Sequence, residues 1–318
     1  RPVAEGRRHA RIGMIVRTVL GDIDPTELGV TYAHEHLIID SSTVAREWPH
    51  IHLPSVDEAV AEVGICVAAG VNAFIDAMPT GSGRNLDKLA QVSRSTGAHV
   101  IATTGMHTMK YYEGVEWAND DAGSLAHRFL AEIQQGVNGV RAGVIKVATT
   151  GPSLTERERA VIEAAGIVHE RTGVPVLTHC EEGLGALEQI GALEGAGVDL
   201  SRVIVSHTDK VAEVDYHKAI LETGVNVEYD QSLRQHLVGS SGTASLVAAM
   251  LERGFGDQLL LGTDGARRSL WTSLGGSPGL AWLKRGFPVV LAEYGVTDQN
   301  LHSMLVRNPA RILAFHPD

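Results

Sequence analysis

Residues 143–180 read GVIKVATTGPSLTERERAVIEAAGIVHERTGVPVLTHC and contain one complete strand, helix and strand unit. The runs Gly143–Val147 and Val174–Thr178 are short and almost wholly apolar, which is typical of strands covered on both faces. Between them, Thr155 and Glu158 have the spacing of a capping box at the start of a helix. The stretch therefore predicts two parallel strands joined by a crossover helix.

The same alternation repeats along the chain. Eight runs read as buried strands: Val30–Ala33, Ala73–Ala77, His99–Thr103, Gly143–Val147, Val174–Thr178, Arg202–Ser206, Gly224–Glu228 and Gln258–Gly262. A second capping box is predicted at Ser55 and Glu58. No GxGxxG motif follows the first strand and no linker divides the chain, which disfavours a doubly wound open sheet. The fold class is therefore predicted to be α/β, a (β/α)8 TIM barrel.

Two segments lie outside this repeat. Val16–Leu20 and Gly29–Thr31, which flank the sequence GDIDPTE, are expected to pair as a short N-terminal hairpin below the barrel. Residues 1–13 are set apart as a tail, with Met14 as an alternative start. Residues 14–318 are expected to form a single barrel domain.

The composition excludes several classes of protein. The 318 residues carry 27 Lys and Arg against 38 Asp and Glu, a net charge of −11, which argues against a nucleic-acid partner. Two cysteines cannot form a disulfide framework in a chain of this size. Neither a long apolar stretch nor a signal-peptide pattern is present, so we expect no membrane partner and a cytoplasmic location.

Polar residues follow five of the predicted strands. Side chains alternate along a strand, so His34 and His36 are expected to point toward the barrel axis while Glu35 points away from it. The other strand-end residues are Lys146, His179, His207 and Asp264. Active sites of α/β barrels lie at this end of the strands, so we expect these side chains to converge there.

Imidazole nitrogens and carboxylate oxygens are zinc-type ligands, and their convergence predicts a metal site. Lys146 has two readings, since an ammonium group would be repelled by divalent ions. It is either a buried lysine paired with an acid such as Asp264, or a neutral amine that reacts with carbon dioxide to give an anionic carbamate ligand.

The order and spacing of these residues, together with RTVLGDIDPTELGVTYAHEHL at 17–37, resemble the phosphotriesterase-like branch of the amidohydrolase superfamily. The resemblance implies a (β/α)8 barrel, a homodimer, and two divalent ions, zinc with manganese or cobalt as alternatives. It implies one ion on His34, His36 and Asp264, a more exposed ion on His179 and His207, and a carboxylated Lys146 bridging both.

The resemblance also implies a reaction, the hydrolysis of an ester-type bond by a metal-bridging hydroxide. Asp264 is expected to take the proton of that hydroxide and pass it to the leaving group. Lys146 and Asp264 are thus the expected catalytic residues.

The residues after Asp264 suggest the class of substrate. Arg267 and Arg268, within GARRSLW…GGSPG, resemble the family members that open phosphorylated sugar lactones, where paired arginines hold the phosphate. Gly265 and Arg234 depart from that subgroup, but Arg234 is still expected to contact substrate, and so is Tyr111.

The stretch Gly275–Gly279 reads as a helix start with Pro278 at the first helical position, and this would give a further anion site.

The resulting hypothesis is a binuclear lactonase for a phosphorylated sugar lactone or a similar small anionic ester. The alternative within hydrolases is a carboxylesterase or a lactonase for unphosphorylated lactones, with promiscuous organophosphate hydrolysis. The alternative from another class is a catalytically silent barrel that binds a sugar phosphate.

Overall fold

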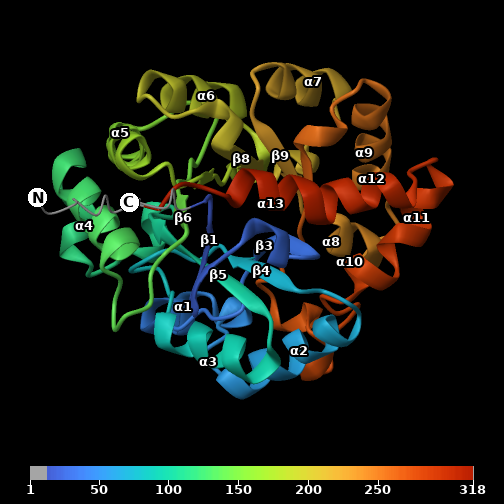
Figure 1. Cartoon of the computed structure of the whole chain (residues 1–318), viewed down its shortest axis with the longest axis horizontal. Helices are drawn as coiled ribbons and strands as arrows, with labels where there is room; N and C mark the ends of the chain where they lie inside the picture. The colour runs from blue at the N-terminus through green and yellow to red at the C-terminus, as the bar shows by residue number, and fades with distance from the viewer. Residues whose placement is uncertain (1–12, 318) are drawn as a thin grey trace, which may run out of the picture.

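The computed structural model describes residues 13–317, and eight parallel strands form its central sheet (Figure 1). Each strand pairs with the next along the chain, as the apolar runs predicted. The strands are β3 (Thr31–Glu35), β4 (Ala73–Asp76), β5 (His99–Gly105), β6 (Val144–Lys146), β7 (Val176–Leu177), β8 (Val203–Ser206), β9 (Asn226–Tyr229) and β10 (Leu259–Leu261).

The sheet closes into a barrel where the first strand meets the last. The amides of Thr263 and Asp264 donate to the His34 carbonyl at 3.2 and 3.0 Å. The carboxylate of Glu35 accepts from the Thr263 amide at 2.9 Å and from the Thr263 hydroxyl. The (β/α)8 barrel is therefore confirmed, and Glu35, which points away from the axis, fastens its seam.

Helices surround the strands (Figure 1). They are α1 (Ser42–Glu47), α2 (Val56–Ala68), α3 (Leu86–Thr96), α4 (Ala122–Gln134), α5 (Glu156–Thr172), α6 (Ala186–Gly195), α7 (Val214–Glu222), α8 (Ser232–Leu237), α9 (Gly242–Glu252), α10 (Trp282–Arg285), α11 (Phe287–Glu293), α12 (Asp298–His302) and α13 (Asn308–Leu313). Among residues 13–317, none of these helices combines the length and apolarity needed to cross a bilayer.

The predicted capping boxes differ in outcome. At α5, Thr155 and Glu158 form both reciprocal hydrogen bonds, as expected. At α2, Ser55 accepts from the Glu58 amide, but the Glu58 carboxylate pairs with Arg268 instead of completing the box. The second box is therefore only half formed, because a guanidinium group competes for its acid.

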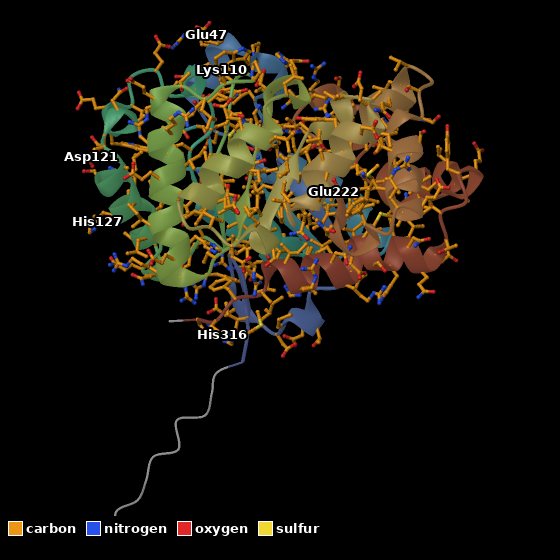
Figure 2. All side chains as sticks on the ribbon, turned by 90° about the horizontal axis from the view of Figure 1, so that it is seen from above. Glu47, Lys110, Asp121, His127, Glu222 and His316 are labelled. Atoms are coloured by element: carbon orange, nitrogen blue, oxygen red, sulfur yellow. The ribbon has the colours of Figure 1, made fainter. Side chains whose placement is uncertain are left out.

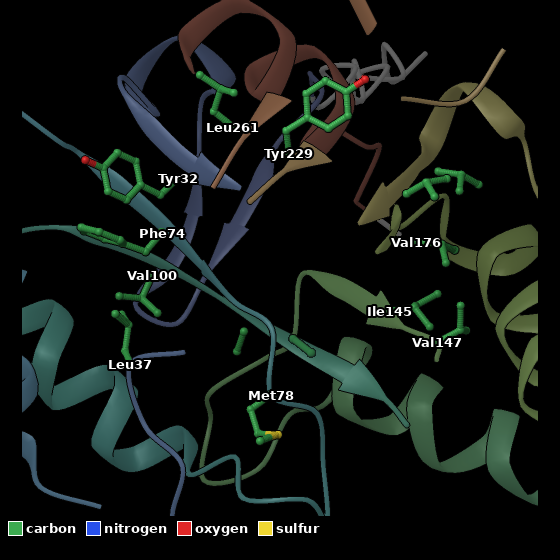
Figure 3. Packing of buried hydrophobic residues seen from close by; sticks show 14 of the residues in the cluster. Tyr32, Leu37, Phe74, Met78, Val100, Ile145, Val147, Val176, Tyr229 and Leu261 are labelled. Carbon is green, nitrogen blue, oxygen red and sulfur yellow. The ribbon is translucent and has the colours of Figure 1, made fainter. Parts of the chain in front are cut away.

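Two apolar layers hold the barrel together. The outer layer lies between strands and helices, and Figure 3 shows Tyr32, Phe74 and Val100 from neighbouring strands within it. The inner layer fills the barrel and includes Ile204 and Leu260. Because side chains alternate along each strand, the next inward position is free to carry a polar group at the upper end of the barrel.

The N-terminal hairpin has a different partner from the one predicted. β1 (Val16–Thr18) pairs with β2 (Gly21–Ile23), while Thr31 belongs to the first barrel strand. The predicted pairing with Gly29–Thr31 is wrong because the chain turns earlier, and Val19 donates to Val100 of β5 instead. Of the tail set apart from the domain, residues 1–12 lie outside the described residues.

Candidate metal centre

The six predicted ligands come together at one end of the barrel. They lie at or just after the ends of β3, β6, β7, β8 and β10, and inner-layer residues such as Val144 and Leu177 lie one inward position below Lys146 and His179. Figure 2 places this end of the molecule near Lys110, which lines the same cavity as His179, and opposite His316. The strand-end pattern in the sequence therefore found a real convergence.

One group of ligands surrounds Asp264. Its Oδ1 lies 3.3 Å from His36 Nε2 and 4.0 Å from His34 Nε2. His34, His36 and Asp264 thus place one donor atom each within a space that could hold a metal ion. The donors come from both sides of the barrel seam, since His34 and His36 lie at the end of β3 and Asp264 follows β10.

The other two histidines lie beside this group. The His179 and His207 ring centroids are 4.6 Å apart, and the His34 and His207 rings are 4.8 Å apart. All four imidazoles are buried. Imidazoles crowded together without bonds between them are suited to share cations through their ring nitrogens.

Lys146 is fully buried below these rings. Its Nζ lies 3.5 Å from His34 Nε2 and donates to the Thr178 carbonyl at 3.0 Å. Among residues 13–317 no ion pair joins it to Asp264, whose described partners are Arg234 and the histidines, so the salt-bridge reading of Lys146 is not supported. Burial lowers the pKa of Lys146 to about 8, which raises the fraction of neutral amine near neutral pH well above that of an ordinary lysine.

Asp264 is held ionised. Burial alone would raise the pKa of its carboxyl group, but Arg234 and the neighbouring histidines outweigh burial, and that pKa lies well below its usual range. Arg234 Nη2 is 3.0 Å from Asp264 Oδ2 and donates to the Asp264 carbonyl at 2.6 Å. Arg234 therefore lines the cavity but is directed at Asp264.

Three of the histidines have one ring nitrogen close to a polar side chain. His207 Nδ1 lies 2.7 Å from Asp230 Oδ2, His179 Nε2 lies 2.7 Å from Glu181 Oε2, and His34 Nδ1 lies 3.1 Å from Ser206 Oγ. Such partners fix the tautomer and orientation of a ligating imidazole. For His207 and His179 the opposite nitrogen is left for an ion, whereas His34 Nε2 faces Lys146 Nζ at 3.5 Å.

Sequence reasoning missed Asp230 and Glu181. Both follow strand ends, Asp230 after β9 and Glu181 two residues after His179. The same signal that singled out the six ligands was therefore present. It was not decisive because an acid after a strand is common, and only the fold shows which imidazole it faces.

The backbone is strained at two of the expected ligands. His207 has φ +68° and Asp264 has φ +43°, in the left-handed region that side chains with a Cβ rarely adopt. Such conformations cost about 1–3 kcal/mol and cluster at functional sites. The fold thus holds both side chains in place at a cost in stability.

A cavity of about 230 Å³ lies over these residues. Tyr111, Arg234 and Arg267 line it, as do the apolar side chains of Trp48 and Ile51. Arg267 is exposed and has no ion-pair partner among residues 13–317. Its guanidinium group is therefore available to an anion at the mouth of the cavity.

The structure places Arg268 elsewhere, contrary to expectation. It makes two hydrogen bonds to the Glu58 carboxylate, at 2.9 and 3.0 Å, and does not line the cavity. The expected anion site at Gly275–Gly279 is also wrong. The helix α10 begins only at Trp282, without a side-chain cap, and spans four residues.

The chain is similar to known proteins along most of its length. Residues 14–313 match the model of the Phosphotriesterase family. A phosphotriesterase homology protein of Mycobacterium tuberculosis is 31% identical over 317 residues, which cover 93% of this chain and 97% of that protein. A phospho-furanose lactonase of Mycoplasmopsis synoviae is 29% identical and covers 94% of this chain and 91% of its own length.

Solved structures are similar as well. A lactonase from Listeria monocytogenes superposes with a TM-score of 0.89 at 26% identity, covering 95% of this chain and 99% of the other. The phosphotriesterase homology protein of Escherichia coli, complexed with phosphate in its active site, has a TM-score of 0.84 at 30% identity, with 92% and 100% covered. Together with the candidate metal ligands, these relatives indicate a metal-dependent hydrolase of ester bonds. The chain belongs to the phosphotriesterase family.

Proposed function

We propose that this chain is a binuclear metal-dependent lactonase that opens a phosphorylated sugar lactone. The observation that carries the proposal is the composition of one cavity. His36, His179, His207 and Asp264 line it, and His34 and Lys146 lie buried beside them. Arg267, which has no ion-pair partner among the described residues, stands at its mouth.

The residues fit two ions. His34, His36 and Asp264 would hold the first, and His179 and His207 the second, each through the nitrogen that its neighbour leaves free. Lys146 Nζ is near His34 Nε2 and has no acid partner in the part of the chain that the structure describes, so a carboxylated Lys146 would be placed to bridge them. Zinc is the expected metal, with manganese or cobalt as alternatives.

When bound, two divalent ions lower the pKa of a shared water and polarise the substrate carbonyl oxygen. Proton transfer would be carried out by the chain's own residues. Asp264 is ionised and can accept a proton, then deliver it to the leaving oxygen of the lactone. Arg234 keeps the Asp264 carboxylate oriented through its contact at 3.0 Å.

Arg267 supports an anionic substrate. A guanidinium group without a carboxylate partner is suited to bind a phosphate through two parallel hydrogen bonds. Tyr111 would form one wall of the same cavity. Two relatives are named phospho-furanose lactonases, which agrees with this substrate class.

The apolar side chains of Trp48 and Ile51 support a second candidate, a lactonase or carboxylesterase for unphosphorylated substrates with promiscuous organophosphate hydrolysis. An aryldialkylphosphatase of Saccharolobus solfataricus is 27% identical over 250 residues, which cover 76% of this chain and 78% of that protein. A silent sugar-phosphate-binding barrel is the candidate without catalysis.

A metal analysis and a substrate panel test these proposals. The protein is reconstituted with zinc or manganese in the presence of bicarbonate, and we expect two ions per chain. Phosphorylated and free aldonolactones are then assayed by acid release, and we expect a higher kcat/KM for the phosphorylated ones. Fewer than two ions would refute the binuclear site, equal rates would favour the second candidate, and binding without turnover would favour the silent barrel.

A further inference from the structure

The Glu181 side chain turns back onto the imidazole of its own strand end. Glu181 Oε2 lies 2.7 Å from His179 Nε2. The backbone around it is fixed, because the Glu181 amide donates to the Thr149 carbonyl at 3.1 Å and Glu182 has φ +53°. Gly183 follows at φ +75°, where a Cβ would lie 2.7 Å from the His207 carbonyl oxygen. The turn therefore fixes the backbone from which the Glu181 side chain reaches His179.

The loop after β5, residues 106–112, holds the other side of the same carboxylate. Lys110 Nζ lies 3.5 Å from Glu181 Oε1, and the same ammonium group lies 5.3 Å from the centroid of the Tyr111 ring. Figure 2 shows Lys110 at the end of the molecule where the loops gather. Glu181 thus contacts a metal-ligand candidate with one oxygen and a loop residue with the other.

The same loop also contacts His179 directly. The ring centroids of His107 and His179 are 4.5 Å apart, and His107 lies 4.8 Å from Tyr111. His107 Nδ1 accepts from the Thr108 amide at 2.7 Å, which fixes the orientation of the His107 ring. His179 therefore lies between a ring of the loop and a carboxylate that the loop holds.

We propose that Glu181 is a positioning residue for His179, and that Lys110 holds Glu181 in that role. An imidazole that donates Nε2–H to a carboxylate presents the lone pair of Nδ1 to an ion. The inference rests on the proposed two-ion site. It goes further by making the occupancy of the second, more exposed ion depend on the loop that also lines the substrate cavity.

Zinc affinity provides the first test. Reconstituted protein is titrated with a competing chelator, and the affinities of the two ions are measured separately. Glu181→Ala is expected to weaken the second ion by roughly 10- to 100-fold and leave the first unchanged. Glu181→Gln retains an oxygen acceptor and should restore part of the loss. Lys110→Met is expected to weaken the same ion by no more than about fivefold, because an exposed ion pair contributes little.

Two control variants show whether the effects come from the specific contacts of Glu181 and Lys110 or merely from the loss of a charge. Glu182→Ala removes the neighbouring exposed carboxylate, and Lys218→Met removes a lysine from a similarly exposed ion pair with Glu222. Neither should change zinc binding. Adding Lys110→Met to Glu181→Ala should have no further effect, since Lys110 acts through Glu181. Wild-type affinity in Glu181→Ala, or a full additional loss in the double variant, would overturn the proposal.

A second readout does not need metal. In the zinc-free protein labelled with ¹⁵N-histidine, NMR reports which ring nitrogen carries the proton. His179 should be the Nε2–H tautomer in the wild type and in Glu182→Ala, and lose that preference in Glu181→Ala. An unchanged tautomer would refute the positioning role. If the wild type bound fewer than two ions while this tautomer shift occurred, the proposed function would fail and the role of Glu181 would stand.

Discussion

Arg267 and Arg268 are adjacent in the sequence but have different surroundings, and this difference yields a prediction. Arg267→Ala should raise KM for a phosphorylated lactone about tenfold, the effect of losing roughly 1.5 kcal/mol from a charge-assisted contact, and should change KM for the free lactone little. Steady-state kinetics on the two substrates provide the measurement.

Arg268→Ala is the matched control, because Arg268 is paired with Glu58. It should affect both substrates equally and lower the free energy of unfolding by less than about 1 kcal/mol. A larger, phosphate-specific effect of Arg268→Ala would contradict this assignment.

Lys146 supports a second prediction. Lys146→Ala should abolish hydrolysis, since the proposed bridge between the ions is lost, and a short carboxylic acid should restore part of the activity by occupying the vacated space. Activity is measured with and without added acetate or propionate. Substantial activity of the variant without the acid would refute the carbamate.

The contrast between found and missed residues has a physical basis. The strand ends of a barrel share one rim, so a residue's place in the sequence gives its place in the fold. For that reason the sequence could predict the convergence of His34, His36, Lys146, His179, His207 and Asp264. The pairing of Arg268 with Glu58 could not be predicted, since it depends on how a loop meets α2. The contacts of Asp230 with His207 and of Glu181 with His179 could not be predicted either, because they depend on the orientation of the imidazole rings.

At the scale of elements, the link between α4 and β5 leads to a prediction about pH. Arg84 Nη1 lies 2.7 Å from Glu132 Oε2, and the Thr104 hydroxyl donates to the same oxygen at 2.7 Å. Burial would raise the pKa of Glu132, but Arg84 outweighs it and the pKa lies below the usual 4.5. The pair therefore stabilises the fold above about pH 4.5, and this stabilisation is lost as the pH falls further through the lowered pKa.

Urea unfolding of the wild type and of Glu132→Gln checks this link. The wild type should be the more stable protein at pH 7, and its advantage should shrink as the pH falls below about 4.5. An advantage that grew at low pH would mean that the Glu132 carboxyl group is protonated in the native protein, contrary to the ion pair.

The elements differ in how well sequence reveals them. The eight strands were predictable because buried parallel strands are short apolar runs. The hairpin partner was wrong because Val19 and Leu20 read as a continued strand, whereas the chain turns there and Gly21 adopts φ +130°. The prediction of a helix start at Gly275–Gly279 was wrong. No helix begins there because backbone amides of this stretch donate to the carbonyls of Ser269, Leu270 and Trp271.

At the scale of the whole molecule, the inner layer of the barrel should contribute strongly to stability. Ile204 is fully buried within that layer, and Ile204→Ala should lower the free energy of unfolding by about 2–5 kcal/mol. Val289→Ala, at a side chain that is 64% exposed, should change it by less than about 0.5 kcal/mol. Chemical denaturation measures both, and similar effects would contradict the layered core.

The association state is a further property of the whole molecule. A homodimer remains the expectation from the family resemblance. Light scattering coupled to size-exclusion chromatography should give twice the monomer mass of 33.9 kDa. A mass equal to one chain would refute the dimer without affecting the site, whose described residues all come from one chain.

The seam that Glu35 fastens also sets an order of events. Glu35 and Thr263 are 228 positions apart, and His34 and Asp264 lie beside them on the two sides of the seam. A chain emerging from the ribosome therefore lacks the first ion's ligand set until its last strand has been made and docked. The first ion therefore cannot nucleate folding of this protein; it can only capture the closed barrel, and when bound it should act mainly by slowing the opening of that seam.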